Sequence, residues 1–194
     1  MIQIDDGPLE SIDQIVETPR GEIGELMVRG PVVTQAYVTR TESNALHKVQ
    51  DGETVWHRMG DVGYLDDQDR FWFCGRKGHR IETEQGTLFT IRCEAIFNRL
   101  KFVYRSALVG VGPEGRKRPI LIAEPWPEDF PQSPEEHHKQ LEQLREAAAG
   151  HPLTSSVETF FLHQSLPVDI RHNSKIFREK LAVWAEQQLA SSDG

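Results

Sequence analysis

The chain has 194 residues, 38% of them hydrophobic, a formal net charge of -8 at pH 7 and two cysteines, which is typical of a globular protein with a buried core. The acidic charge argues against non-specific binding to nucleic acid or to an anionic membrane, because both partners require a basic face. Two cysteines are too few for a disulfide framework or a four-thiolate zinc site, and no segment resembles a signal peptide or a membrane-spanning helix, so a reducing cytoplasm is the expected location.

The first half of the chain has the pattern of short strands separated by turns. Short apolar or alternating runs occupy residues 2–4, 25–28 and 71–74. Turn-forming sequences bound these runs, including Asp-Asp-Gly-Pro at residues 5–8 and an acidic turn at residues 66–69. We therefore expect a small β-rich unit over residues 1–75.

After residue 75 the pattern changes to alternating strands and helices. Strands are expected at residues 106–111, 120–124 and 159–163, and helices near residues 94–100, after residue 133 and at the end of the chain. The long middle helix is delimited by Ser133 as N-cap, Pro134 at the first helical position, Glu136 completing a capping box and Gly150 as a stop. The last helix has an apolar stripe that should dock on the sheet, formed by Phe177, Leu181 and Trp184. Residues 76–194 should thus form an α+β unit, and the expected fold class of the chain is α+β.

Two motifs in the second half resemble nucleotide or phosphate sites but have better structural explanations. Residues 110–115 match the dinucleotide pattern G-x-G-x-x-G, yet an apolar strand follows where that pattern requires a helix N-terminus. The adjacent Arg116-Lys117-Arg118 is better explained as the solvated tip of a hairpin than as a phosphate clamp, because the same loop contains Glu114.

Three segments carry the motifs that suggest chemistry. Residues 21–31 read GEIGELMVRGP, residues 56–80 read WHRMGDVGYLDDQDRFWFCGRKGHR, and residues 166–178 read LPVDIRHNSKIFR. In this order they resemble the G-E-[IL]-x-[VIL]-x-G, ribose-binding, hinge and lysine motifs of the adenylate-forming superfamily. That superfamily includes acyl-CoA synthetases, peptide-synthetase adenylation domains and luciferases.

The resemblance implies a role for individual residues. Asp61 would accept hydrogen bonds from the ribose hydroxyls of ATP, each worth about 1.5–3 kcal/mol, and Arg76 would contact ribose or phosphate oxygens. Lys175, in a loop that leads into the last helix, would contact the α-phosphate and the acyl carboxylate. A unit charge at about 4 Å contributes about 4 kcal/mol there, or about three decades of rate. The hinge residues would be Gly75, Lys77 and Gly78, within residues 75–79.

The resemblance also implies a larger enzyme. Residues 1–75 would be the last β-rich subdomain of the large domain, and residues 76–194 its mobile C-terminal domain. No phosphate loop rich in Ser, Thr and Gly is present, so the binding of ATP and Mg²⁺ would depend on a missing N-terminal adenylation domain. The chain alone is therefore expected to be inactive, and none of its residues is assigned as a metal ligand.

The residues after the hinge indicate a branch of the superfamily. Coenzyme A ligases usually have a basic I-K-x-x-G loop here, whereas residues 81–86 read IETEQG, and their two glutamates would repel a thiol-bearing polyanion. The runs at residues 56–61, 73–77 and 169–176 look more like the olefin β-lactone synthetases of bacterial hydrocarbon synthesis. That family resemblance implies conversion of a long-chain 2-alkyl-3-hydroxy acid to a β-lactone, with release of AMP and pyrophosphate and without coenzyme A. It also implies assembly with a hydrolase-fold decarboxylase and a reductase.

Two other functions and several site assignments stay open. The chain could be part of a long-chain acyl-CoA ligase that makes a thioester, or a non-catalytic interaction module in which Lys175 is inert. His172 could order its loop by a hydrogen bond or act directly in the site. Arg171 and His79 are further candidates for a base or a phosphate ligand.

Overall fold

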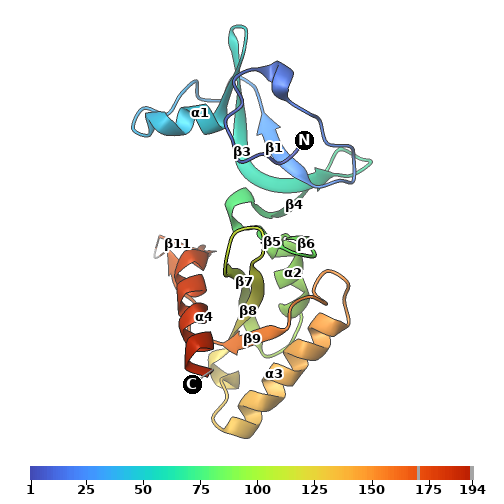
Figure 1. Ribbon diagram of the computed structural model, residues 1–194, viewed down its shortest axis with the longest axis vertical. Coiled ribbons are helices and arrows are strands. Elements are labelled where there is room, and N and C mark those ends of the chain that lie inside the picture. Colours follow the sequence, from blue (N-terminus) through green and yellow to red (C-terminus); the bar gives the residue numbers. More distant parts are fainter. Residues whose placement is uncertain (170, 193–194) are drawn as a thin grey trace. The chain divides into compact units, whose positions relative to one another are not determined.

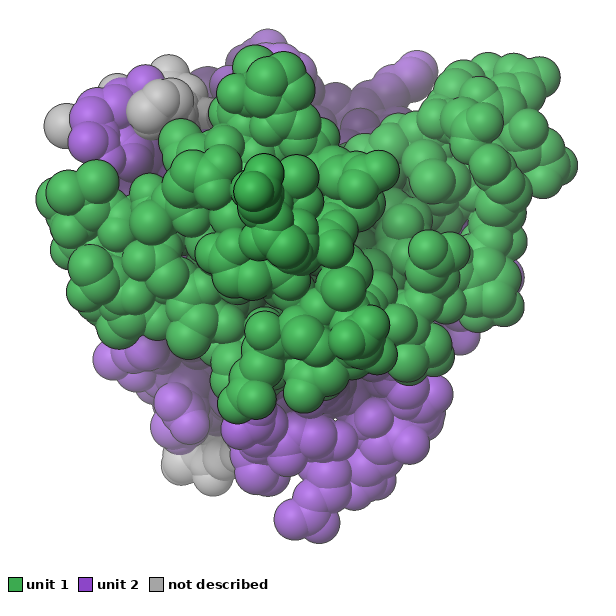
Figure 2. Space-filling model, turned by 90° about the horizontal axis from the view of Figure 1, so that it is seen from above, with its two compact units in different colours: residues 1–78 green, residues 79–194 purple. Residues whose placement is uncertain are grey.

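The computed structural model describes residues 1–169 and 171–192, with only the backbone for residues 172–174 and 192. The chain divides into two compact units, Met1–Gly78 and His79–Gly194, which Figure 2 shows in different colours. The boundary lies within residues 75–79, where the hinge is expected. Movement about this boundary stays a prediction.

Unit 1 is built on one antiparallel sheet in which the long strand β3 pairs with the other strands (Figure 1). Its elements are η1 Ile12–Gln14, β1 Gly24–Val28, η2 Thr41–Ser43, α1 Asn44–His47, β2 Lys48–Asp51, β3 Thr54–Leu65, β4 Phe71–Arg76 and η3 Lys77–His79, whose last residue belongs to unit 2. The order is β1-β3-β2, and β4 also pairs with β3. The β-rich character agrees with the sequence prediction, but residues 2–4 form only isolated bridges, between Ile2 and Glu17 and between Ile2 and Glu25.

The turn between β3 and β4 is closed by the carboxylate of Asp66. It accepts hydrogen bonds from Trp72 Nε1 at 2.8 Å, from Arg70 Nε at 2.7 Å, and from the backbone N–H groups of Gln68 and Arg70 at 2.9 and 3.0 Å. The hydrogen bond from Trp72, together with those from Arg70 and Gln68, holds the pKa of Asp66 well below its ordinary value. The acidic turn expected from the sequence is thus an ordered connection between two strands.

We expect Asp66→Asn to make the stability of the protein less sensitive to acid. A carboxyl group whose pKa is depressed in the folded state stabilises the fold above its unfolded pKa of about 4, and this contribution is lost as the pH falls below that value. Urea unfolding at neutral pH and at about pH 3 should therefore show a smaller difference for Asp66→Asn than for the parent. The exposed neighbour offers the control Asp67→Asn. A pH dependence of Asp66→Asn equal to that of the parent would contradict this assignment.

Unit 2 contains a central three-stranded sheet of order β7-β8-β9, with two small hairpins and three longer helices. Its elements are β5 Ile81–Thr83, β6 Gly86–Leu88, α2 Thr90–Phe97, β7 Val103–Val111, β8 Arg118–Pro125, η4 Pro127–Asp129, α3 Pro134–Ala149, β9 Thr159–Leu162, β10 Val168–Asp169, β11 His172–Ile176 and α4 Arg178–Ser192. β7 and β8 are antiparallel, and β9 runs parallel to β8 after the crossover through α3. Within the described residues, no helix has the length and apolar character needed to cross a membrane.

The two faces of this sheet are covered by different helices (Figure 1). Alternate strand residues point to opposite faces. Leu108 and Leu121 are buried in one cluster with residues of α2 and α3, whereas Val109 and Ile122 are buried in another with Leu181 and Ala185 of α4. The α+β class is confirmed, and the stripe of the last helix docks on the sheet as expected. Phe177, however, precedes α4 instead of belonging to it.

The long helix α3 begins and ends where the sequence predicts. Ser133 Oγ accepts a hydrogen bond from Glu136 N at 3.1 Å, and Gly150 follows the last helical residue. The Glu136 carboxylate accepts from Gln132 N at 2.7 Å, one residue before the N-cap, so the expected capping box closes one residue earlier. Residues 110–118 form the antiparallel β7–β8 hairpin, which confirms that the glycine pattern is not a dinucleotide fingerprint.

Candidate functional site

Asp61 lies in an irregular segment of β3. The register between β1 and β3 shifts between Glu25 and Met27, so that residues 59–61 of β3 bulge out opposite a single residue of β1. Gly60 has a φ of 67°, a left-handed conformation that glycine adopts without steric cost. Bulges of this kind re-aim side chains and occur often beside functional sites.

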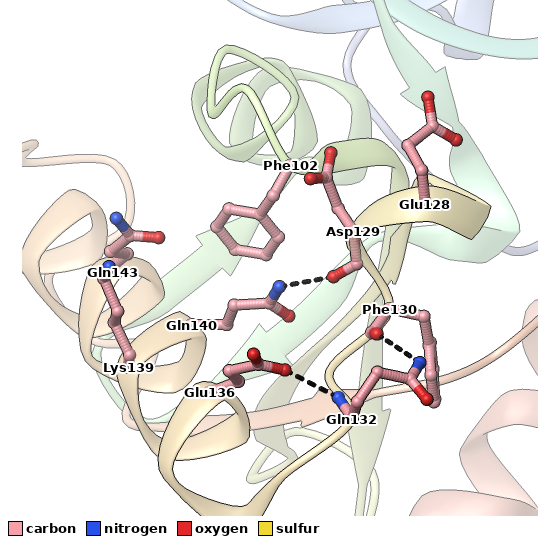
Figure 3. Close-up of a pocket in the computed structure, with 9 residues that line it drawn as sticks. All are labelled: Phe102, Glu128, Asp129, Phe130, Gln132, Glu136, Lys139, Gln140 and Gln143. Atoms are coloured by element: carbon pink, nitrogen blue, oxygen red, sulfur yellow. Dashed lines mark hydrogen bonds between the residues drawn. The ribbon is translucent and has the colours of Figure 1, made fainter.

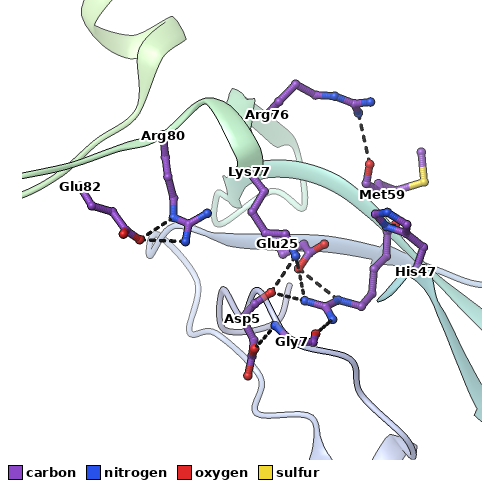
Figure 4. Close-up of polar contacts among 10 residues, drawn as sticks. Asp5, Gly7, Glu25, His47, Met59, Arg76, Lys77, Arg80 and Glu82 are labelled. Carbon is purple, nitrogen blue, oxygen red and sulfur yellow. Dashed lines mark hydrogen bonds and ion pairs between the residues drawn. The ribbon is translucent and has the colours of Figure 1, made fainter. Parts of the chain in front are cut away.

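Arg76 is the residue paired with Asp61 across β3 and β4. Its Nη1 donates to Asp61 Oδ1 at 2.5 Å and to the backbone oxygen of Met59 at 3.2 Å, the second contact being drawn in Figure 4. The side chain of Asp61 is 21% exposed and that of Arg76 is 56% exposed. The structure therefore brings together two of the residues expected from the sequence, a carboxylate acceptor and a guanidinium donor at one bulge.

The residues expected to form the hinge are anchored in unit 1 up to Lys77. Gly75 is a buried residue of β4 with a φ of 137°. Lys77 Nζ donates to Glu25 Oε2 at 3.0 Å and to the backbone oxygen of Asp5 at 2.7 Å. Gly78 is exposed, and no atom lies within 4 Å of the position that a Cβ would occupy there. Gly78 is thus the expected hinge residue with the fewest local restraints.

Lys175 lies on a strand and not in the loop that the sequence suggested. It belongs to β11, which pairs with β10 in a two-stranded hairpin. Its side chain is exposed and has no hydrogen bond or ion pair with any described residue. The hairpin places the lysine directly before Ile176, which is buried against the sheet. Lys175 is thus a cation without a partner among the described residues, on a strand that is anchored to the sheet.

A buried ion pair fixes the chain just after Lys175. Arg178 Nη2 donates to Glu94 Oε1 and Oε2 at 2.8 and 2.7 Å, and the same carboxylate accepts from Leu108 N at 2.8 Å. Burial raises the pKa of Glu94, while Arg178 acts in the opposite direction. The pair links the start of α4 to α2 and β7, so the base of the Lys175 hairpin is held to the core of unit 2.

The accessory candidates lie near this hairpin or at the boundary of the unit. Arg171 donates to the Asp169 carboxylate, with Nη2 at 3.2 Å from Oδ2. His79 Nε2 lies 3.6 Å from Glu179 Oε1 in the first turn of α4. The side chain of His172 lies outside the described residues. Arg171 and His79 are therefore paired with carboxylates within unit 2.

Basic side chains lie next to the two glutamates of residues 81–86, the segment that was expected to repel coenzyme A. Arg80 Nη2 donates to Glu82 Oε1 at 2.8 Å. Glu84 lines a pocket of about 330 Å³ together with Arg116, Lys117 and Arg118. These cations lie beside the two glutamates and offset part of their charge. The expected repulsion of coenzyme A stays a prediction.

A second pocket, of about 320 Å³, lies beside α3 (Figure 3). Two of its amide side chains make local hydrogen bonds: Gln140 Nε2 donates to Asp129 O at 2.6 Å, and Gln132 Nε2 donates to Phe130 O at 2.8 Å. None of the site residues expected from the sequence lines it. We assign it no part in the candidate site.

The sequence interpretation missed a buried charged cluster in unit 1, formed by Glu25, Arg58 and Lys77 and called the Glu25 cluster below (Figure 4). Glu25 and Arg58 are fully buried, with side-chain exposures of 0%. Both residues stand in the quoted motif segments, at residues 21–31 and 56–80. The signal that could have identified them is a charged residue at a strand position where the alternating pattern would place a buried apolar side chain.

The fold is that of the C-terminal part of the adenylate-forming ligases. The chain superposes on o-succinylbenzoate coenzyme A synthetase from Bacillus subtilis in complex with ATP and magnesium, with a TM-score of 0.68, 23% identity, and coverage of 90% of this chain and 33% of that chain. Amide bond synthetase McbA from Marinactinospora thermotolerans gives a TM-score of 0.71 and 23% identity, over 92% of this chain and 34% of that chain. No family model matches the chain.

In sequence, the chain is similar to olefin β-lactone synthetases over nearly its whole length. It is 44% identical to the enzymes of Stenotrophomonas maltophilia and Xanthomonas campestris over 97% of its own length. A 2-succinylbenzoate–CoA ligase of Oceanobacillus iheyensis is 28% identical over 48% of this chain and 19% of that protein. The chain spans 34% of the length of the two β-lactone synthetases.

Proposed function

We propose that the chain is the C-terminal part of an ATP-dependent β-lactone synthetase. The longer enzyme would convert a long-chain 2-alkyl-3-hydroxy acid to a β-lactone, with release of AMP and pyrophosphate, in the cytoplasm. The observation that carries this proposal is the identity of 44% over 97% of the chain to olefin β-lactone synthetases. Similarity to a coenzyme A ligase covers only half as much of the chain.

In this proposal ATP activates the acid, and Asp61 and Arg76 bind the ribose of ATP. Asp61 Oδ1 is engaged by Arg76, while Oδ2 has no protein hydrogen bond within the described residues. A partly exposed carboxylate with a free oxygen is suited to accept hydrogen bonds from ribose hydroxyls. Arg76, which is more exposed, can use its other N–H groups on ribose or phosphate oxygens.

Lys175 supplies the cation for the reacting groups in this proposal. An exposed ammonium that has no partner in the described part of the chain can bind between the α-phosphate and the acid carboxylate and stabilise the negative charge that develops there. Mg²⁺ is proposed to accompany the ATP phosphates, and no residue of this chain is assigned to it. The 3-hydroxyl oxygen of the substrate then bonds to its own carbonyl carbon, AMP leaves, and the hydroxyl proton is released.

The remaining residues and partners complete the proposal. Gly75, Lys77 and Gly78 form the hinge to the C-terminal domain, and Arg171, His172 and His79 are accessory to Lys175. An N-terminal adenylation domain of the same protein would provide the phosphate loop and the acyl site, so the isolated chain should release no AMP. A hydrolase-fold decarboxylase and a reductase would act on the product.

The test is product analysis with the purified full-length protein. ATP, Mg²⁺ and a 3-hydroxy acid, without coenzyme A, should yield AMP and the lactone, identified by mass spectrometry as the acid less one water. The closure needs no second acceptor, because the nucleophile belongs to the substrate. Product formation that depends strictly on coenzyme A would contradict the proposal.

The second candidate function is acyl-CoA ligation. It is favoured by the cations Arg116, Lys117 and Arg118 beside the β5–β6 hairpin, which could attract a polyanion. The same incubation with coenzyme A would then give an acyl thioester in place of the lactone.

A further inference from the structure

In the Glu25 cluster, three nitrogen atoms donate hydrogen bonds to a single oxygen atom. Glu25 Oε2 accepts from Arg58 Nη2 at 2.7 Å, from Arg58 Nε at 3.2 Å and from Lys77 Nζ at 3.0 Å. Arg58 also donates to the backbone oxygens of Gly7, at 2.7 Å, and Asp5. A buried ion pair is weak evidence for stability, because apolar residues of similar volume often serve as well. The arrangement therefore needs a reason beyond stability.

The cluster holds the chain on both sides of the Asp61–Arg76 pair. Arg58 directly precedes the bulge that carries Asp61, and Glu25 lies across from the end of that bulge, so their ion pair spans its base. Lys77 directly follows Arg76. One carboxylate thus restrains both strands at the place where the two site residues meet.

We propose that Glu25 is a positioning residue for nucleotide binding. By holding Arg58 and Lys77 it sets the shape of the bulge and the end of β4, and through them the placement of Asp61 and Arg76. The inference rests on the proposed function, since it gives these two residues their ribose contact. Burying charged groups has an energetic cost, and this positioning role would give the buried Glu25 and Arg58 a functional reason.

The test compares ATP affinity and turnover in variants of the full-length protein. Glu25→Gln should weaken the Kd and KM for ATP about tenfold and change kcat by less than about twofold, because a ribose contact is made equally in the ground state and the transition state. Glu22→Gln makes the same chemical change at an exposed position in the same segment and should retain parent values.

A double variant separates positioning from a general structural effect. In an Asp61→Ala background, Glu25→Gln should weaken ATP binding by clearly less than tenfold, because the part of its effect that acts through Asp61 is already lost and only the part through Arg76 remains. An unchanged affinity for ATP in Glu25→Gln, or the full tenfold loss repeated in the Asp61→Ala background, would overturn the inference. A lowered melting temperature and kcat with unchanged KM would also overturn it, as the sign of a merely structural role.

Lys77→Met provides a second variant that leaves the buried Arg58–Glu25 pair intact. If Glu25→Gln does not fold, the inference stands when Lys77→Met weakens ATP binding and falls when it does not. Calorimetry with ATP alone measures nucleotide binding without any lactone formation. Its result therefore tests the positioning role separately from the proposed function. A parent that binds ATP but forms no lactone contradicts only the proposed function, whereas a parent that does not bind ATP overturns both.

Discussion

Replacing Lys175 by alanine in the full-length protein should slow acid-dependent AMP formation about a thousandfold, since a unit charge at about 4 Å contributes about 4 kcal/mol at an effective dielectric near 20. The structure supports a direct role for this charge. Lys175 is exposed, has no partner among the described residues, and stands on a strand whose next residue is buried. Removing it should leave the fold intact, so the loss should appear in the rate and not in the melting temperature.

The control for Lys175→Ala is Lys139→Ala, which removes an exposed lysine from α3 in the same unit. It should retain the parent rate. Lys175→Arg keeps the charge but changes its geometry, and should recover only part of the rate. If Lys175→Ala forms AMP as fast as the parent, the lysine is not catalytic, and the interaction-module reading gains support.

Asp61→Ala should raise the KM for ATP about a hundredfold, with a smaller effect on kcat. Two hydrogen bonds to a carboxylate, each worth about 1.5–3 kcal/mol, account for a loss of at least this size. The loss should fall mainly on KM because the ribose does not change during the reaction. The measurement is the dependence of pyrophosphate release on ATP concentration.

A substrate analogue makes the Asp61 prediction specific to ribose. In the parent, 2′-deoxy-ATP removes one of the two hydroxyl donors and should raise KM. In Asp61→Ala it should raise KM no further, because the acceptor is already absent. Asp67→Ala, at an exposed carboxylate in the β3–β4 turn, is the matched control. An equal penalty for 2′-deoxy-ATP in the parent and in Asp61→Ala would contradict the ribose assignment.

The elements with strong local signals could be predicted from the sequence. Ser133, Pro134 and Gly150 delimit α3 because capping depends on residues that are neighbours in sequence. The strand that follows the glycine pattern at residues 110–115 excluded a dinucleotide site for the same kind of local reason. The α+β class followed from the change of pattern after residue 75.

Features that depend on strand register could not be predicted. The bulge at residues 59–61 is an irregularity in the pairing of β3 with β1. No local pattern predicts a contact between residues 33 positions apart, as in the Glu25–Arg58 hydrogen bond. Lys175 was expected in a loop because the short β10–β11 pairing has few residues to show an alternating pattern. The ion pair between Arg80 and Glu82 likewise could not be predicted from the charges of the segment alone.

We propose that this chain completes an enzyme that activates an acid with ATP and needs no coenzyme A to do so. The most direct measurement is exchange of labelled pyrophosphate into ATP by the full-length protein, with a long-chain 3-hydroxy acid present and coenzyme A absent. We expect exchange that requires the acid and is lost in Lys175→Ala. Exchange that is absent without coenzyme A, or that proceeds equally in Lys175→Ala, would contradict it.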